Sequence, residues 1–252
     1  MTFRAAAAFL FLSFLFTSAA FAQGGPPVVT DDPGTPGDGH WEINTAGIWQ
    51  GSTDGNQLFL PYVDANYGWG DHIQLKVETG YMTEQQPQSS ANSGESAILA
   101  GVKWRFIDED KAGFAMSTYP QVQSHPFFAS SDPNIAESGT QLILPIEFSK
   151  SFGKVGLNPE VGYVMSRIPD NPNEYFYGAV MSYEFEKDRE ALFEIHGRAR
   201  ENAPERELLY NIGGRYAFNE SISAIGAIGH SWMTYQAQAP FTLIYLGLQT
   251  RL

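Results

Sequence analysis

The 252-residue sequence contains no cysteine, few basic residues and, after residue 22, no long hydrophobic run. Without cysteine, the chain can form no disulfide, no thiolate metal site and no cysteine nucleophile. Its 15 Lys and Arg against 28 Asp and Glu give a formal net charge of -13. This acidity argues against a nucleic-acid partner, because such proteins present a basic face to phosphates. The lack of an apolar run of about 18 residues excludes a transmembrane helix in this part of the chain.

The first 22 residues have the pattern of an export signal. Arg4 is followed by an apolar run over 5–16, and Ala20-Phe21-Ala22 places small residues at the two positions that determine cleavage. The alternative, a membrane anchor, would need roughly 20 apolar residues. We therefore predict a signal peptide over 1–22 and a mature chain that begins at Gln23.

The mature chain is rich in strands that alternate apolar and polar residues. Over 72–82, Ile73, Leu75 and Val77 lie on one face, and the polar face carries Gln74 and Lys76. This period of two is typical of a strand with one apolar side. The preceding segment alternates in the same way and places Phe59 on its apolar face. The same pattern predicts twelve strands, at about 40–50, 57–69, 72–82, 96–107, 112–123, 139–149, 154–166, 175–185, 190–200, 207–218, 221–235 and 241–252. The faces of the strand at 221–235 cannot be assigned, because it alternates poorly.

The predicted connections alternate between short turns and long polar loops. The long ones are 83–95, 124–138 and 167–174. An even number of strands of about ten residues, with short turns on one rim, is the layout of an antiparallel transmembrane β-barrel of the bacterial outer-membrane type. Aromatic residues also fall near both rims, as expected at membrane interfaces: Trp41, Trp69, Trp104, Phe148, Phe185, Phe218 and Trp49, Tyr81, Tyr163, Tyr210, Trp232. The alternative is a soluble β-sandwich or lipocalin-like barrel, with its apolar faces turned inward.

In a membrane barrel, the polar faces of the strands would line the lumen. Acidic and basic residues balance there, and they form the predicted substrate path: Glu42, Asp64, Lys76, Glu78, Lys103, Arg105, Glu147, Glu160, Glu184, Glu194, Arg198, Arg200, Arg215 and Arg251. One interpretation is a structural network that fills the lumen and sets the strand register. The other is a narrow conduit that orients a polar or aromatic solute. Twelve strands is more than the eight or so that side chains fill alone and fewer than in open porins.

Two blocks near the start of the mature chain resemble one known family. These blocks are Pro27-Val28-Val29-Thr30-Asp31-Asp32-Pro33-Gly34-Thr35 with Gly39-His40-Trp41-Glu42-Ile43-Asn44, and the stretch from Leu60 to Trp69 with 74–77. They are similar to the family named for the meta-pathway of phenol degradation, a group of proposed outer-membrane transporters. The resemblance covers most of the mature chain and is specific over about 30–80. It implies a barrel and the movement of hydrophobic or aromatic compounds.

The Pro-, Gly- and Asp-rich segment at 23–39 precedes the barrel domain at 40–252. Its Thr30-Asp31-Asp32-Pro33 sequence is a turn. The segment could fold into the barrel mouth as a plug, with Asp31 and Asp32 meeting lumen arginines. A solvated turn is the alternative.

The five histidines do not form a catalytic arrangement. His125 and His230 each stand beside a serine, but neighbouring side chains of an extended chain point apart. No nucleotide-binding, hydrolase or metalloprotease motif occurs in its required context, and no histidines have metal-ligand spacing. The sequence therefore predicts no enzyme, no cofactor and no metal site.

These patterns together predict an outer-membrane barrel that gives small, aromatic or hydrophobic solutes passive passage. A structural or adhesion barrel with a plugged lumen is the first alternative, and an outer-membrane hydrolase is the second. The predicted partners are outer-membrane lipid and lipopolysaccharide, the solute and, during biogenesis, periplasmic chaperones and the barrel-assembly machinery. The acidic outer loops could bind lipopolysaccharide phosphates through divalent metals, or they are a solvated face.

Overall fold

The computed structural model describes residues 25–124, 139–168, 171–201, 206–233 and 239–252, and of Met233 only the backbone. The predicted signal peptide and most of the loop at 124–138 lie outside these ranges. Within them, the chain forms fourteen strands and one short helix: β1 (Trp41–Ser52), β2 (Gly55–Trp69), β3 (Ile73–Gln85), β4 (Asn92–Glu95), β5 (Ile98–Ile107), α1 (Glu109–Ala112), β6 (Ala115–Thr118), β7 (Gln121–Ser124), β8 (Thr140–Phe152), β9 (Val155–Ser166), β10 (Glu174–Glu186), β11 (Arg189–Arg200), β12 (Arg206–Ala217), β13 (Ile222–Met233) and β14 (Thr242–Arg251).

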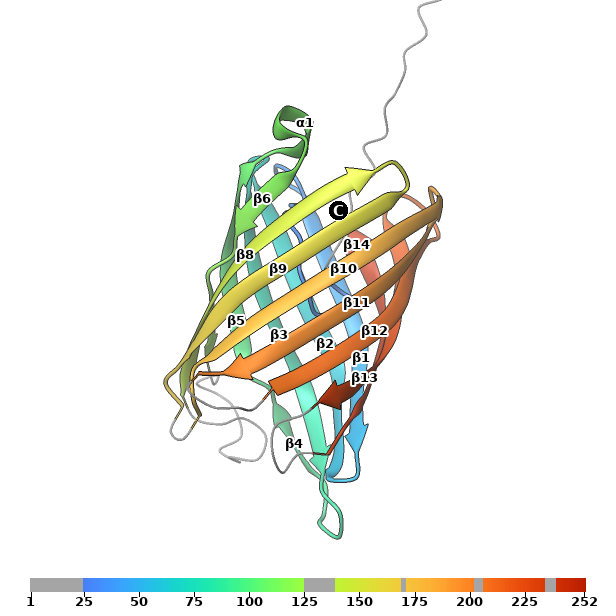
Figure 1. Ribbon diagram of the computed structural model, residues 1–252. Helices are drawn as coiled ribbons and strands as arrows, with labels where there is room; N and C mark the ends of the chain where they lie inside the picture. Colours follow the sequence, from blue (N-terminus) through green and yellow to red (C-terminus); the bar gives the residue numbers. More distant parts are fainter. Residues whose placement is uncertain (1–24, 125–138, 169–170, 202–205, 234–238) are drawn as a thin grey trace, which may run out of the picture.

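The strands close into an antiparallel barrel with twelve strand positions around its wall (Figure 1). β1 pairs with both β2 and β14, which closes the sheet on itself. Two of these positions are each occupied by two consecutive short strands. β4 and β5 both pair with β3, and β6 and β7 both lie between β5 and β8. The twelve predicted strands are confirmed, and the interruptions fall at Ser96–Ala97 and at Tyr119–Pro120. Proline cannot donate a ladder hydrogen bond, which accounts for the second break.

The two ends of the barrel differ (Figure 1). Short turns and α1 lie at one end, and the longer β3–β4 hairpin lies at the other. No helix in the described part of the chain is long and apolar enough to cross a membrane.

The side chains are arranged in the reverse of a soluble protein. The outer wall carries exposed large apolar residues, among them Val77, Val102, Ile146, Val161, Ile212, Ile228 and Leu246. Buried polar residues face inward, among them Asn44, Asp64, Lys103, Glu147, Asn158, Glu194, Asn211 and Gln249. Such an outer surface is stable against lipid and would aggregate in water. The lipocalin-like alternative is therefore wrong.

A β-bulge corrects one predicted face. The register of β2 shifts between Phe59 and Tyr62 against β3, and the neighbouring β1–β2 ladder shifts between Ala46 and Ile48. A bulge inserts an extra residue and changes which side chains face inward beyond it. Phe59, expected on the lipid side by strict alternation, therefore lines the interior.

The structure also assigns the faces of β13. Ser223, Ile225, Ala227 and Ser231 are buried in the interior, while Ile228 and Trp232 are exposed. Ile225 and Ala227 pack with Ala46 and Tyr245 in a small apolar cluster. The alternation was hard to detect because apolar residues occur on both faces of this strand.

Candidate functional site: the barrel lumen

The segment before β1, residues 25–40, enters the lumen from the short-turn end. It is attached there to the β2–β3 turn. The Gly39 amide donates to the Gly68 carbonyl at 2.9 Å, the Gly70 amide donates to Asp38 Oδ1 at 2.8 Å, and Thr35 Oγ1 donates to the Asp71 carbonyl at 2.8 Å. This short-turn anchor fixes the direction in which the segment runs.

The tip of the segment is a tight turn buried among the strands. The Gly25 amide donates to the Thr30 carbonyl at 2.7 Å, and the positive φ of Gly25, 73°, suits a residue that lacks Cβ. Val28 packs against Val180 of β10 and Leu192 of β11. Thr30 is completely buried, and it lies so close to Gly178 that a larger residue there would collide with it.

Two wall carboxylates accept hydrogen bonds from the backbone of this tip. The Val29 and Thr30 amides donate to Glu194 Oε1 at 3.0 and 2.5 Å. The Asp31 amide donates to Glu160 Oε2 at 3.2 Å. Both glutamates are at most 6% exposed, so these bonds form where water competes little.

Lys103 joins the segment to the opposite side of the wall. Its ammonium donates to Asp31 Oδ1 at 3.0 Å and to the Asp32 carbonyl, and it lies 3.4 Å from Glu147 Oε2. Ser117 Oγ also donates to Glu147. The Lys103 side chain is 2% exposed, so this lysine depends on these oxygens to replace its hydration. Asp31 and Asp32 therefore meet a lumen lysine, where the sequence interpretation had expected arginines.

A second polar cluster lies within the wall itself. Lys76 Nζ is 3.1 Å from Glu78 Oε2 and 3.6 Å from Asp64 Oδ1. Asp64 also accepts hydrogen bonds from the side-chain amides of Asn44, at 3.3 Å, and Asn66, at 3.0 Å. These residues come from β1, β2 and β3, so neighbouring strands alone assemble the cluster.

The remaining predicted path residues separate toward the two ends. Arg251 Nε donates to Glu42 Oε2 at 3.1 Å, and Arg105 Nε donates to Asp108 Oδ1 at 3.0 Å. Toward the long-loop end, Arg198 and Arg200 lie 3.8 and 3.6 Å from Glu174. Two further residues, Arg215 and Glu184, are half-buried on the wall. The charges therefore form separate groups along the barrel and not two continuous rows.

Sequence reasoning missed several lumen residues. Glu174 was counted with the loops, although it continues the buried phase of β10 that includes Phe176 and Val180. Neutral side chains such as Asn211, which donates to Glu194, were passed over because they carry no charge. The alternation of each strand contained this signal.

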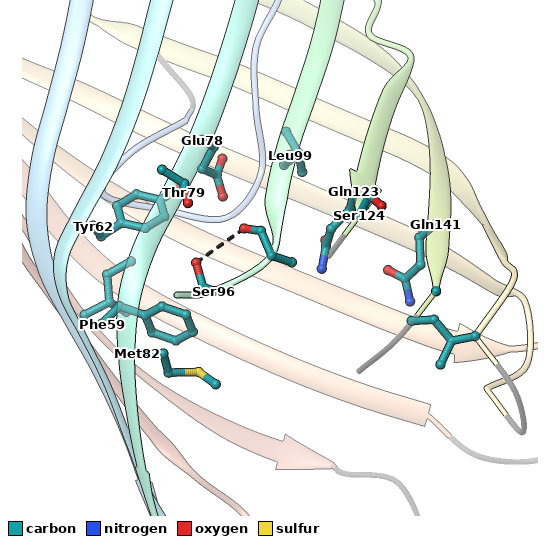
Figure 2. Close-up of a pocket in the computed structure, with 14 residues that line it drawn as sticks. Phe59, Tyr62, Glu78, Thr79, Met82, Ser96, Leu99, Gln123, Ser124 and Gln141 are labelled. Atoms are coloured by element: carbon teal, nitrogen blue, oxygen red, sulfur yellow. Dashed lines mark hydrogen bonds between the residues drawn. The ribbon is translucent and has the colours of Figure 1, made fainter. Parts of the chain in front are cut away.

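A cavity of about 440 Å³ lies in the lumen toward the long-loop end. Figure 2 shows apolar side chains, Phe59, Tyr62 and Met82, on one side of it, and amides and hydroxyls, including Gln123 and Gln141, on the other. Among the described residues that line it, Glu78 is the one acidic side chain and none is a lysine or arginine. The volume falls within the usual range for small-molecule sites.

The ends of the barrel carry ionised carboxylates. Hydrogen bonds from Lys111, His72 and Arg105 hold the pKa of Asp108, in the turn after β5, well below its usual value. At the other end, hydrogen bonds from Asn173 and Tyr163 lower the pKa of Glu201. No group of acidic residues and histidines in the described ranges has the geometry of a metal site.

Comparisons with known proteins give likeness in structure only. No family's sequence profile matches the chain, and no curated protein sequence does. Among solved structures, the COG4313 outer membrane channel from Pseudomonas putida F1 superposes with a TM-score of 0.69 at 11% identity, over 89% of this chain and 100% of that one. The NanC porin gives 0.61 at 9%, over 83% and 100%. The KdgM porin gives 0.56 at 13%, over 83% and 98%. The chain therefore has the twelve-stranded fold of bacterial outer-membrane channels.

Proposed function

We propose that this protein is an outer-membrane channel that gives small solutes passive passage, and that residues 25–36 occlude its lumen. The observation that carries the proposal is the segment itself. It lies inside a closed barrel and is held there by noncovalent contacts with wall side chains. Because these contacts are separate from the ladder hydrogen bonds between the strands, the segment can leave while the barrel stays closed. The polar lining and the apolar outer surface fit a path through a membrane.

The finer substrate class rests on the cavity and on the sequence resemblance. The resemblance to the phenol meta-pathway family suggests aromatic or hydrophobic compounds. Phe59, Tyr62 and Met82 offer an apolar wall for such a solute, and the amides opposite offer hydrogen bonds. Small-molecule sites commonly combine these two kinds of lining.

The alternative is a permanently plugged structural barrel, and the same segment contacts favour it. A disulfide lock separates the two functions. A Cβ at Gly178 would lie 3.0 Å from Thr30 Cβ, and a disulfide needs about 3.5–4.5 Å, so the segment has to shift away from β10 for the bond to form. Since Gly178→Cys crowds the segment in either redox state, the comparison is between the oxidised and reduced forms of the same protein. Because the natural chain has no cysteine, the pair Thr30→Cys and Gly178→Cys gives one defined bond.

The lock is tested by single-channel conductance and by flux of phenol, benzoate and sugars of similar size into liposomes, judged against protein-free vesicles. We expect the oxidised pair to conduct less than the reduced pair, and each single-cysteine variant to ignore the redox state. A variant that lacks residues 25–34 should conduct more than the natural protein. If the oxidised and reduced pairs conduct equally, the segment does not leave the lumen, the channel function is wrong and the plugged barrel stands.

A further inference from the structure

The tip of the N-terminal segment shows which chemistry the middle of the lumen can bind. Three buried carboxylates, Glu147, Glu160 and Glu194, surround it, each at most 6% exposed. Two of them contact the segment directly. Glu194 accepts hydrogen bonds from the Val29 and Thr30 amides, and Glu160 accepts one from the Asp31 amide. Toward Glu160 and Glu194 the segment is therefore a donor, whereas it accepts hydrogen bonds from Lys103 on the other side.

The acceptors are not fully used. Glu147 Oε1 and Asn211 Oδ1 are buried and have no hydrogen-bond partner in the described structure. Glu147 is completely buried and Asn211 is 1% exposed. A buried acceptor without a donor costs free energy, so these two oxygens can each take a hydrogen-bond donor from a ligand.

The three glutamates differ in whether a positive charge lies beside them. Lys103 can neutralise Glu147, from which it lies 3.4 Å. Glu160 and Glu194 form no ion pair with a lysine or arginine in the described ranges. If the segment leaves, these two carboxylates lose their backbone donors and line the lumen. A solute that takes the place of the segment replaces these bonds only if it brings hydrogen-bond donors, and a positive charge stabilises it further.

We propose that Glu147, Glu160 and Glu194 form an amine-binding site in the lumen, which the N-terminal segment occupies as a stand-in for a solute with a protonated amine on a short apolar stem. The ammonium takes the positions of the Val29, Thr30 and Asp31 amides. The stem takes the place of Val28 between Val180 and Leu192. This inference rests on the proposed channel function and names its preferred solute class.

The test uses Thr30→Cys as a reporter of segment displacement. Thr30 is completely buried and its Oγ1 has no hydrogen-bond partner, so the substitution removes no contact of that oxygen. The rate of maleimide labelling of a buried thiol follows the population of the open state. The full-length protein in liposomes is labelled in the presence of n-butylammonium chloride, sodium butyrate or n-butanol at equal ionic strength.

We expect n-butylammonium to accelerate labelling by about tenfold, which corresponds to 1.4 kcal/mol of population shift, and butyrate and butanol to leave the rate unchanged. Adding Glu194→Gln should abolish most of the amine effect, because the amide has lost the charge. Glu186→Gln, an equal charge change at an exposed turn residue, is the matched control and should keep it. Equal acceleration by butyrate, or no acceleration by the amine, overturns the amine site.

Conductance separates this failure from failure of the channel. The variant that lacks residues 25–34 is measured under a salt gradient, and we expect its reversal potential to show preference for cations that Glu160→Gln reduces. If this variant conducts without cation preference, the amine site is wrong and the channel function stands. If it does not conduct while the amine still accelerates labelling, the site is real and the channel function is wrong.

Discussion

Two lumen lysines, Lys76 and Lys103, lie over the same tyrosine ring, Tyr119, at 5.8 and 4.7 Å from its centroid, yet they have different partners. The ion-pair partners of Lys76 lie on its own strand and on the adjacent β2. Lys103 reaches the N-terminal segment and Glu147 of β8, which is not a neighbour of β5 along the chain. The comparison shows two kinds of lumen network. One lies entirely within the wall, and the other also includes Asp31 and Asp32 of the segment.

The largest expected effect comes from Lys103→Met. The substitution leaves the buried Glu147 and the half-buried Asp31 without this cation, and removal of one partner of a buried pair costs about 3–5 kcal/mol. Because part of this cost is relieved when the segment leaves, we expect faster labelling of Thr30→Cys and higher conductance. Labelling at the natural rate would show that Lys103 does not hold the segment.

Lys76→Met is the matched change in the wall network. We expect it to lower the free energy of unfolding by about 2–3 kcal/mol, measured by urea denaturation of the refolded barrel, because Asp64 keeps its hydrogen bonds from Asn44 and Asn66. Labelling of Thr30→Cys should stay slow. Fast labelling in this variant would mean that the two networks are one.

A smaller effect is expected for Asn211→Ala. It removes the side-chain donor to Glu194 Oε2 and leaves the segment amides in place. A hydrogen bond to a charged group contributes about 1.5–3 kcal/mol, and part of this remains because Val29 still donates to the same oxygen. The expected result is a loss of about 1 kcal/mol in urea denaturation with labelling only slightly faster. Leu209→Ala, two residues away on the same face of β12, is the control for the loss of side-chain volume.

The smallest effect is expected outside both networks, for Asp108→Asn. Its folded-state pKa lies below the ordinary value of 3.8, so the carboxylate stabilises the fold above that ordinary value and loses this contribution as pH falls through the folded pKa. We expect the natural protein to melt slightly higher than Asp108→Asn from pH 5 to 8, and the difference to vanish in strong acid. A difference that grows as pH falls would contradict this assignment.

Much of the wall could be predicted because its physics is local. Alternation placed Asp64 and Lys76 on the inner face, and the hairpin register then brought them together. The prediction of Phe59 was wrong because a bulge at the neighbouring proline shifts the phase, and period-two counting does not detect an inserted residue. The choice of Lys103 as the partner of Asp31 could not be predicted, because 72 residues separate them and no periodicity links them.

The sequence by itself determined the barrel, its twelve strands and the inner face of most of them, since most strands alternate with a period of two and each short turn pairs consecutive strands. It left open whether the segment at 23–39 is a solvated turn or a plug. The contacts of its described part depend on the tertiary structure, because the buried carboxylates that accept the Thr30 and Asp31 amides come from β11 and β9, which stand beside it only after the barrel has closed.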